Sequence, residues 1–354
     1  MKRRCFLAVV PAAAVRAASP FDEVFEYVKT TTKHGGLLVQ QDGKLLFERY
    51  FGRAHRDAAP NLASIGKSFT SIAAGILMHE RPTLFRDGLD TLVYNDELFP
   101  HPPKDERMRQ IRLGQLLTMT SGIRGNSPGF VSGKAIPVEP PGPDGWQAVT
   151  DSAAMNADLW CEPGAGYSYA TAGVHLVSMI VRHVAGMELE EYLRIRVAEP
   201  LGWSKWGFGY GRPEVTHTPG GGGIKLRAPD VVKFGQMMLQ NGKWNGRQIV
   251  PAGYVKECGS ASAFNPHYPY SLQFDVNTTG QADAPRDAYW KTGSGGHVIY
   301  IVPSLRLVVW KLGGRDDQYD PGDRDDGSRA GFRSAVPPQQ AAHRTLELTV
   351  QALR

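Results

Sequence analysis

Apolar residues recur at helical spacing in several parts of the chain. Between residues 21 and 31, Val24, Phe25 and Val28 fall on one face, which predicts a first helix. The same reasoning predicts a helix that opens at Ser64 and further helices over residues 174–184, 189–197, 230–239 and 339–353.

Two other segments have the pattern of β-hairpins. Residues 37–39 and 45–47 are apolar and flank Asp42-Gly43, a dipeptide that favours tight turns. Near the C-terminus, residues 298–302 and 305–310 bracket a Pro-Ser pair in the same way. Because strands lie at both ends of the chain with helices between them, we predict an α/β (α+β) fold whose sheet is assembled from both termini.

Two long segments lack such patterns. Residues 102–143 are rich in glycine and proline and are expected to hold much of the chain's loop structure. Residues 315–333 mix both charges with glycine, which predicts a solvated loop. The acidic run at residues 323–327 superficially suggests a calcium loop, but its spacing is wrong and the terminal glutamate is absent. No metal site is therefore predicted.

The N-terminal segment is typical of an export signal. Lys2, Arg3 and Arg4 precede a mostly apolar stretch and small residues suited to cleavage, so residues 1–17 are predicted to be a signal peptide. The arginine pair also resembles a twin-arginine signal. The mature domain would then span residues 18–354 in the periplasm or outside the cell. A cytosolic tail is the alternative.

Length and charge exclude some classes of protein. The 354 residues can bury a large core, and no apolar run is long enough for a transmembrane helix. Removing residues 1–17 takes away four basic residues and no acidic one, so the net charge falls from +5 to +1. A nearly neutral protein has no electrostatic case for binding nucleic acid. Cys161 and Cys258 would remain, and we expect them to be unpaired.

The sequence Ser64-Ile65-Gly66-Lys67 opens the second predicted helix and carries candidate chemistry. Residues i and i+3 share a helix face, so Lys67 is expected beside Ser64. A serine hydroxyl becomes a good nucleophile when a base removes its proton, and a lysine serves as that base when burial or nearby positive charge lowers its pKa. The alternative is a capping serine followed by a solvated lysine. A phosphate-binding loop is excluded, because Asn61 stands where that motif needs glycine.

Two more elements follow in the chain. Tyr169 lies in a turn-rich stretch before a predicted helix, and Lys291-Thr292-Gly293 precedes a strand-like run. Ser-x-x-Lys, then a tyrosine element, then Lys-Thr-Gly is the ordered signature of serine β-lactamases and penicillin-binding proteins. The chain resembles the class C β-lactamase-like serine hydrolases, a group that includes β-lactamases, D-amino-acid peptidases, esterases and nylon-oligomer amidases.

Further segments carry the same resemblance over most of the chain. These are Leu-Leu-Thr-Met-Thr-Ser-Gly at 116–122, Glu-Pro-Leu-Gly at 199–202, the glycines at 220–223 and Asn-Gly-Arg at 245–247. The resemblance implies an antiparallel sheet covered by terminal helices, a mainly helical inserted region, and a site between them.

The resemblance also implies roles for the motif residues. Ser64 would attack a carbonyl carbon, and Lys67, Tyr169 or both would accept its proton. Two converging lysines, Lys67 and Lys291, would favour the phenolate of Tyr169. The backbone N–H groups of Ser64 and Ser294 would hold the oxyanion. This chemistry requires no metal and no cofactor.

The same resemblance assigns substrate contacts downstream. Lys291 and Thr292, followed by Gly293 and Ser294, would orient the acyl group or a substrate carboxylate. Thr171 is a departure, because the family's β-lactamases carry asparagine there, and a hydroxyl cannot present an amide's paired donor and acceptor.

Three functions remain open on this basis. The first is a serine hydrolase of a small ester or amide, the second a β-lactamase or D-Ala-type peptidase, and the third a catalytically silent binding protein of the same fold. Trp160, Tyr167 and Trp290 would line an aromatic acyl pocket or belong to the core. His297 would line the pocket or lie on the surface.

Overall fold

The computed structural model describes residues 18–140, 150–209, 213–325, 327 and 329–354. The predicted signal peptide lies outside the described residues, so it and the exported location stay predictions. None of the described helices combines the length and the apolar character that crossing a membrane requires.

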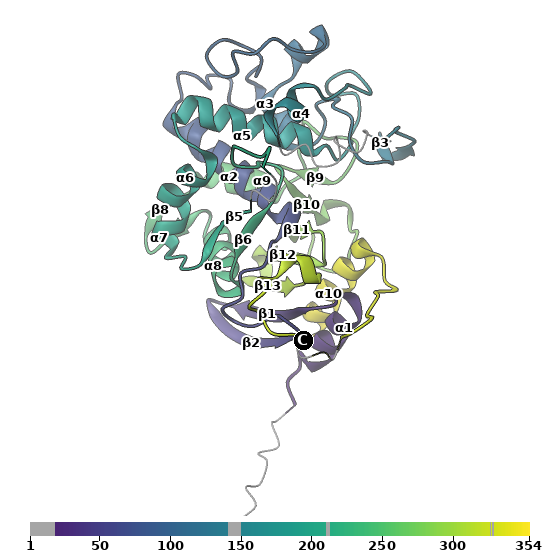
Figure 1. Cartoon of the computed structure of the whole chain (residues 1–354). Coiled ribbons are helices and arrows are strands. Elements are labelled where there is room, and N and C mark those ends of the chain that lie inside the picture. The colour runs from purple at the N-terminus through teal and green to yellow at the C-terminus, as the bar shows by residue number, and fades with distance from the viewer. Residues whose placement is uncertain (1–17, 141–149, 210–212, 326, 328) are drawn as a thin grey trace, which may run out of the picture.

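A seven-stranded antiparallel sheet joins the two ends of the chain, in the order β2-β1-β13-β12-β11-β10-β9 (Figure 1). The N-terminal hairpin pairs with the C-terminal one through β1 and β13, as the sequence predicted. The strands are β1 (Gly35–Gln41), β2 (Lys44–Phe51), β9 (Tyr270–Ser271), β10 (Phe274–Val276), β11 (Tyr289–Gly293), β12 (His297–Val302) and β13 (Leu307–Leu312).

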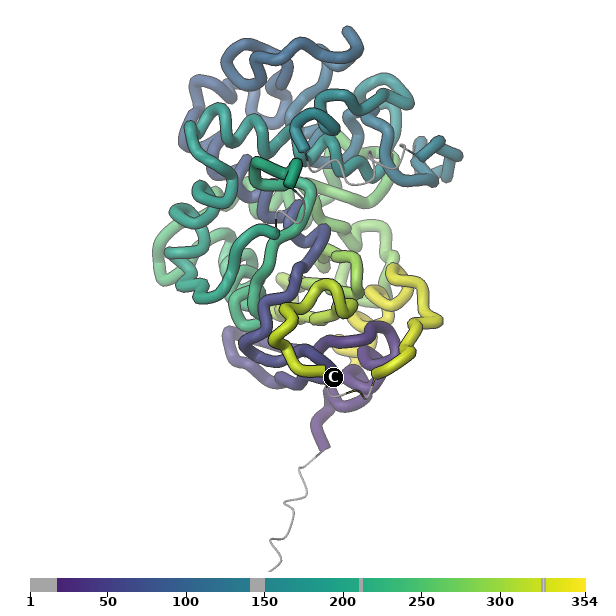
Figure 2. The backbone as a smooth tube through the Cα atoms, viewed as in Figure 1, coloured from purple at the N-terminus to yellow at the C-terminus, as the bar shows by residue number. Residues whose placement is uncertain are grey.

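Two helices from opposite ends of the chain cover one face of this sheet. They are α1 (Asp22–Thr31) and α10 (Pro338–Ala352), and Figure 2 shows these purple and yellow segments side by side. Their apolar faces bury Val24 and Leu346 against sheet residues such as Val39 and Trp290. Burial of apolar surface is the main force that holds this layer together.

The opposite face of the sheet is covered by α8. The core on this face extends into a mainly helical region. Within that region α2 packs against α5, and both belong to the largest apolar core (Figure 1). The remaining helices are α2 (Gly66–Glu80), α3 (Leu113–Leu117), α4 (Asp151–Met155), α5 (Thr171–Ala185), α6 (Leu189–Leu193), α7 (Glu199–Leu201), α8 (Ala228–Leu239) and α9 (Ala252–Cys258).

Three two-stranded antiparallel sheets hold the remaining described strands. They are formed by β3 (Gly129–Val131) with β4 (Lys134–Ile136), β5 (Trp206–Phe208) with β6 (Ile224–Leu226), and β7 (Lys243–Trp244) with β8 (Arg247–Gln248).

The predicted helices and hairpins are confirmed, with local differences. The helix predicted at residues 189–197 is α6 followed by a π-helical turn, Arg194–Ala198. In the second hairpin, Pro303–Leu305 form a 3-10 turn, so β13 begins two residues later than expected. The loop predicted at residues 102–143 also contains a short helix and a hairpin within its described part.

Two further predictions have clear outcomes. Cys161 and Cys258 are both free, as expected. The segment at residues 315–333, predicted as a solvated loop, is only partly exposed to solvent, because Gln318 and Tyr319 are buried. A charged, glycine-containing composition did not reveal that this segment packs against the sheet.

Candidate active site

Ser64 lies on a tight turn at the entrance to α2. The turn is a 3-10 segment, Ala63–Ile65, and α2 starts at the next residue. Ala63 has a positive φ of 50°, a conformation that costs a non-glycine residue free energy. A Cβ on Gly66 would lie 2.8 Å from the Cα of Gly222, so glycine is needed where the two segments meet. The turn leaves the Ser64 side chain half-buried at the edge of the core.

Lys67 lies beside Ser64, as its position in the motif predicted. Its side chain is 2% exposed, and Nζ donates to Ser64 Oγ at 3.1 Å and to the Gly221 carbonyl at 2.5 Å. Burial, and then the positive charge of Lys291, lower the pKa of Lys67 well below its usual value. The alternative of a solvated lysine is therefore wrong.

Tyr169 comes from the stretch before α5 and lies between the two lysines. Its ring centroid is 5.1 Å from Lys67 Nζ and 5.0 Å from Lys291 Nζ. Burial nevertheless raises the pKa of Tyr169, and a hydrogen bond with Ser64 opposes that shift only in part. Burial thus opposes the phenolate that the two lysines were expected to favour, and the same burial lowers the pKa values of both lysines.

Lys291 projects from β11 and is fully buried. Nζ donates to the Tyr169 hydroxyl at 3.2 Å and also to the hydroxyl of Tyr270. Burial lowers the pKa of Lys291, and the carboxylate of Asp275 opposes that shift. Tyr270, whose hydroxyl donates to Gln273 Oε1 at 2.9 Å, is a site residue that the sequence did not reveal, because no recognised motif contains it.

The residues after Lys291 bring β11 against the turn that carries Ser64. A Cβ on Gly293 would lie 2.3 Å from the Leu62 carbonyl oxygen, so the strand and the turn touch at this glycine. Thr292 is half-buried, and Ser294 is exposed just beyond the strand, where its Oγ accepts a hydrogen bond from Arg315 at 3.0 Å. The Lys-Thr-Gly element thus lies next to the turn that carries Ser64.

The glycine segment at residues 220–223 packs against the Ser64 turn, α2 and α5. The Gly220 carbonyl accepts a hydrogen bond from Thr70 at 2.7 Å, and the Gly221 carbonyl accepts one from Lys67. A Cβ on Gly221 would lie 2.3 Å from Thr171 Cγ2, so the methyl group of Thr171, the first residue of α5, packs on this glycine. The sequence had placed these glycines in the family pattern without a role.

Three aromatic or histidine candidates belong to the interior. Trp290 is 1% exposed in the core under α10 and faces away from Lys291. Tyr167 is buried and stacks on Tyr268, close to Tyr270. His297 is fully buried against Trp310, so of its two alternatives, pocket lining and surface placement, the second is wrong. Trp160 is half-buried.

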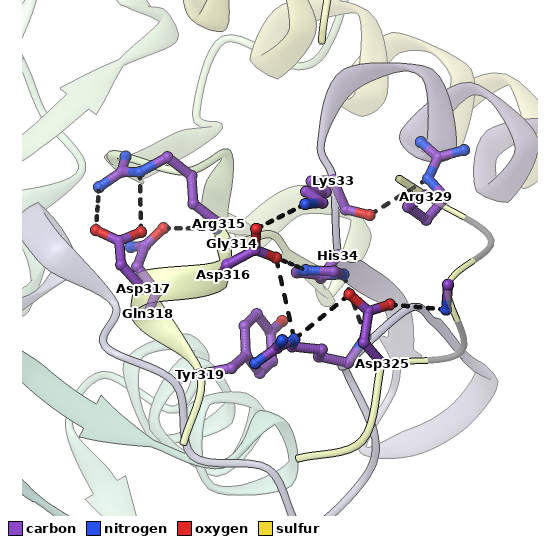
Figure 3. Close-up of polar contacts among 12 residues, drawn as sticks. Lys33, His34, Gly314, Arg315, Asp316, Asp317, Gln318, Tyr319, Asp325 and Arg329 are labelled. Carbon is purple, nitrogen blue, oxygen red and sulfur yellow. Dashed lines mark hydrogen bonds and ion pairs between the residues drawn. The ribbon is translucent and has the colours of Figure 1, made fainter. Parts of the chain in front are cut away.

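One group of described residues has the composition of a metal site. Single ligand atoms of His34, Asp316 and Asp325 lie within 4.8 Å of one another (Figure 3). Lys33 Nζ is 2.6 Å from Asp316, and Arg53 Nε is 3.6 Å from Asp325. These two cations supply the positive charge that the carboxylates need, so the group is an ion-pair network.

Comparison with known proteins gives one family and several solved structures of the same fold. A protein assigned as a β-lactamase from Bacteroides dorei DSM 17855 has a TM-score of 0.70 at 18% identity, over 95% of this chain and 100% of that one. A protein assigned as a 6-aminohexanoate-dimer hydrolase from Bacillus anthracis has a TM-score of 0.66 at 22% identity, over 82% and 77%. EstCE1, described as a hydrolase with promiscuous acyltransferase activity, has a TM-score of 0.66 at 17% identity, over 93% and 97%.

The search of curated proteins gives no match. The sequence model of the Beta-lactamase family matches residues 23–330, which is most of the chain. The chain therefore belongs to the β-lactamase family and is an enzyme of the serine hydrolase type.

Proposed function

We propose that this enzyme cleaves an ester or a small amide through an acyl-enzyme on Ser64. The observation that carries the proposal is the contact between Lys67 Nζ and Ser64 Oγ at 3.1 Å, made by a buried lysine whose pKa is lowered. A lysine of lowered pKa is a neutral amine over a wider pH range and accepts a proton from a neighbouring hydroxyl.

Lys67 is the acylation base in this proposal. Its N–H group donates to the Gly221 carbonyl, which fixes the amine and leaves its lone pair for the proton of Ser64. A protonated Tyr169 suits the next step better than a phenolate, since its raised pKa keeps a proton available for the leaving group. Lys291 orients that phenol through its 3.2 Å hydrogen bond.

The oxyanion would be held by the backbone N–H groups of Ser64 and Ser294. Ser64 precedes α2, where the helix dipole favours negative charge. No hydrogen bond of the Ser294 N–H is found within the part of the chain that the structure describes. Each such donor is typically worth about 3–4 kcal/mol in the transition state. Thr292 and Gly293 would align the acyl group beside this pair.

Thr171 favours an ester or a simple amide over a β-lactam. Its methyl group packs on Gly221, so the position offers substrate a hydroxyl at most and no amide. The intact Lys291-Thr292-Gly293 favours the second candidate, a β-lactamase or D-Ala-type peptidase, since those enzymes share the element. The structural relatives named above include proteins assigned to amide and β-lactam hydrolysis.

A chromogenic ester and a chromogenic cephalosporin, assayed side by side on the purified protein, test the proposal. Ester turnover is expected to exceed cephalosporin turnover, and Ser64→Ala is expected to reduce kcat by about 10⁴-fold or more. Ser304→Ala, at an exposed serine on the β12–β13 turn, is the matched control. Retained turnover in Ser64→Ala refutes the mechanism.

Covalent labelling separates the enzyme from a silent binding protein. A fluorophosphonate should form one adduct per wild-type chain at Ser64, identified by mass spectrometry of peptides. No adduct with the fluorophosphonate or with penicillin would support the silent alternative.

A further inference from the structure

Gln318 is a buried glutamine that lies outside every motif recognised in the sequence. It ends a short 3-10 turn, Asp316–Gln318, after β13, and its side chain is 5% exposed. Nε2 donates to the carbonyl oxygens of Asn61 at 2.8 Å and Ser294 at 2.9 Å, while Oε1 accepts from the N–H of Arg315 at 2.9 Å. All hydrogen-bonding groups of this amide are therefore used.

The two carbonyls that Gln318 joins belong to the two sides of the proposed oxyanion site. Asn61 lies three residues before Ser64, and Ser294 is the proposed second donor. We propose that Gln318 is a positioning residue that sets the separation of the two oxyanion donors. The proposal rests on the function proposed above, and it adds a residue that touches neither substrate nor nucleophile.

On the first side, Asn61 contacts the turn that carries Ser64. Its Oδ1 accepts a hydrogen bond from the N–H of Ala63 at 2.9 Å, and its own N–H donates to the Gln318 carbonyl at 2.8 Å. The Asn61 residue is thus held by both the main chain and the side chain of Gln318. The hydrogen bond from the Ala63 N–H to Asn61 Oδ1 helps to hold Ala63 in its left-handed conformation. The backbone angles of Ala63 in turn set the direction of the Ser64 N–H.

On the second side, Gln318 packs directly under the turn that carries Ser294. A Cβ on Gly295 would lie 2.1 Å from Gln318 Oε1, so only glycine fits there. The Ser294 carbonyl accepts from Gln318, and its hydroxyl accepts from Arg315. Moving the amide would therefore move the Ser294–Gly295 peptide group, which is joined through the Ser294 Cα to the peptide that carries the Ser294 N–H.

The turn that presents Gln318 is anchored from behind (Figure 3). Asp316 Oδ1 is 2.7 Å from His34 Nε2, and its Oδ2 accepts from Lys33 Nζ at 2.6 Å. These two contacts lower the pKa of Asp316 to about 2, Lys33 first, so the carboxylate stays ionised near neutral pH. The network that resembles a metal site thus serves to hold this turn.

Gln318→Met tests the proposal, because methionine has a similar length and no hydrogen-bonding amide. For the chromogenic ester we expect kcat to fall about 10- to 100-fold with KM within about 3-fold, since displaced donors weaken the transition state more than the bound substrate. The inhibition constant of a boronic acid, which forms a tetrahedral adduct on a serine, should rise by a similar factor. Fluorophosphonate titration counts the intact sites, so all values refer to folded enzyme.

The matched control is Gln40→Met, at a half-buried glutamine on β1 whose amide donates to Gln236. It should leave kcat and boronate affinity unchanged. Asp316→Ala releases the exposed anchor of the turn and should show the Gln318 effect in weaker form, about 3- to 10-fold. If Gln318→Met does not fold, the kinetics of Asp316→Ala test the proposal in its place.

Normal kcat and normal boronate affinity per titrated site in Gln318→Met overturn the proposal. If that variant does not fold, unchanged values in Asp316→Ala overturn it. Failure of the proposed function is a separate result, because it would appear as retained turnover in Ser64→Ala.

Discussion

Two neighbouring residues of β11 lie on opposite faces of the central sheet, and burial has different consequences for each. Trp290 points into the apolar layer under α1 and α10, whereas Lys291 points toward Tyr169 and Tyr270, and both side chains are at most 1% exposed. Burial is thus equal on the two faces, and only the available partners differ. On one face burial of the side chain stabilises the fold, and on the other it changes the pKa of a charged group.

A second buried lysine of the central sheet sharpens this contrast. Lys311 on β13 pairs in register with Leu37 and Val298 of the terminal-helix face, and its Nζ donates to the Gly296 carbonyl at 2.6 Å. Burial lowers the pKa of Lys311 to about 7. A lowered lysine pKa therefore does not by itself define a reactive site. What distinguishes Lys67 and Lys291 is their contact with hydroxyl groups.

The largest expected effect is that of Trp290→Ala on stability. Removing a large buried aromatic side chain costs about 3–5 kcal/mol in the free energy of unfolding. Urea unfolding followed by tryptophan fluorescence or circular dichroism measures it. Ester turnover per fluorophosphonate-titrated site should change by less than about 3-fold, since the ring lies on the other face. A large loss of turnover per site would contradict the separation of the two faces.

Lys291→Met should show the reverse pattern. We expect kcat/KM to fall about 10²-fold, because the phenol of Tyr169 loses the group that orients it. The free energy of unfolding should change by less than about 2 kcal/mol, because the desolvation cost of Lys291 is removed while the buried carboxylate of Asp275 loses its positive partner. Steady-state kinetics and urea unfolding on the same sample measure both. A strongly destabilised variant with normal turnover would assign Lys291 a structural role.

The pH dependence of stability should reflect Lys311. Its folded pKa of about 7 lies below the unfolded value of about 10.4, so between these values the unfolded state binds more protons and stability rises with pH. Below about pH 7 this contribution to the slope disappears. Urea unfolding at several pH values should show a shallower rise for Lys311→Met, with a difference of at most about 1.4 kcal/mol per pH unit. Equal slopes for wild type and Lys311→Met would mean that folding does not lower the pKa of Lys311.

Thr171→Asn should have the smallest effect. One added hydrogen bond to a substrate amide is worth about 0.5–1.5 kcal/mol, so cephalosporin kcat/KM should rise by up to about 10-fold. Ester turnover should change by less than about 3-fold. A loss of both activities would show that the contact of the Thr171 methyl group with Gly221 matters more than the missing amide.

Several parts of the fold could be predicted because their sequences carry local signals. Asp42-Gly43 adopts positive φ at both residues and closes the hairpin where expected. The hairpin of β9 and β10 was missed for the opposite reason, since its turn uses Leu272 and Gln273 at positive φ. Tertiary contacts impose that turn, including a hydrogen bond from Ser71 to the Leu272 carbonyl.

The candidate site divides in the same way. Ser64 and Lys67 are three residues apart, so helix geometry alone predicted their contact. Tyr270 and Gln318 were not predicted, because each acts through partners far away in the sequence and neither residue type is diagnostic. The phenolate expected at Tyr169 counted the charge of the two lysines without burial, and burial raises the pKa of that phenol.

The amino-acid sequence by itself determined the order of elements, the helix that follows Ser64 and carries Lys67, and the family, because these depend on spacing along the chain. The tertiary structure alone decided which lysines are desolvated, which hydroxyls they contact, and how the Ser64 turn is fixed against Ser294. The reason is physical: pKa values and hydrogen-bond networks depend on the solvent and partners that folding leaves around each group, and those partners come from segments far apart in the sequence.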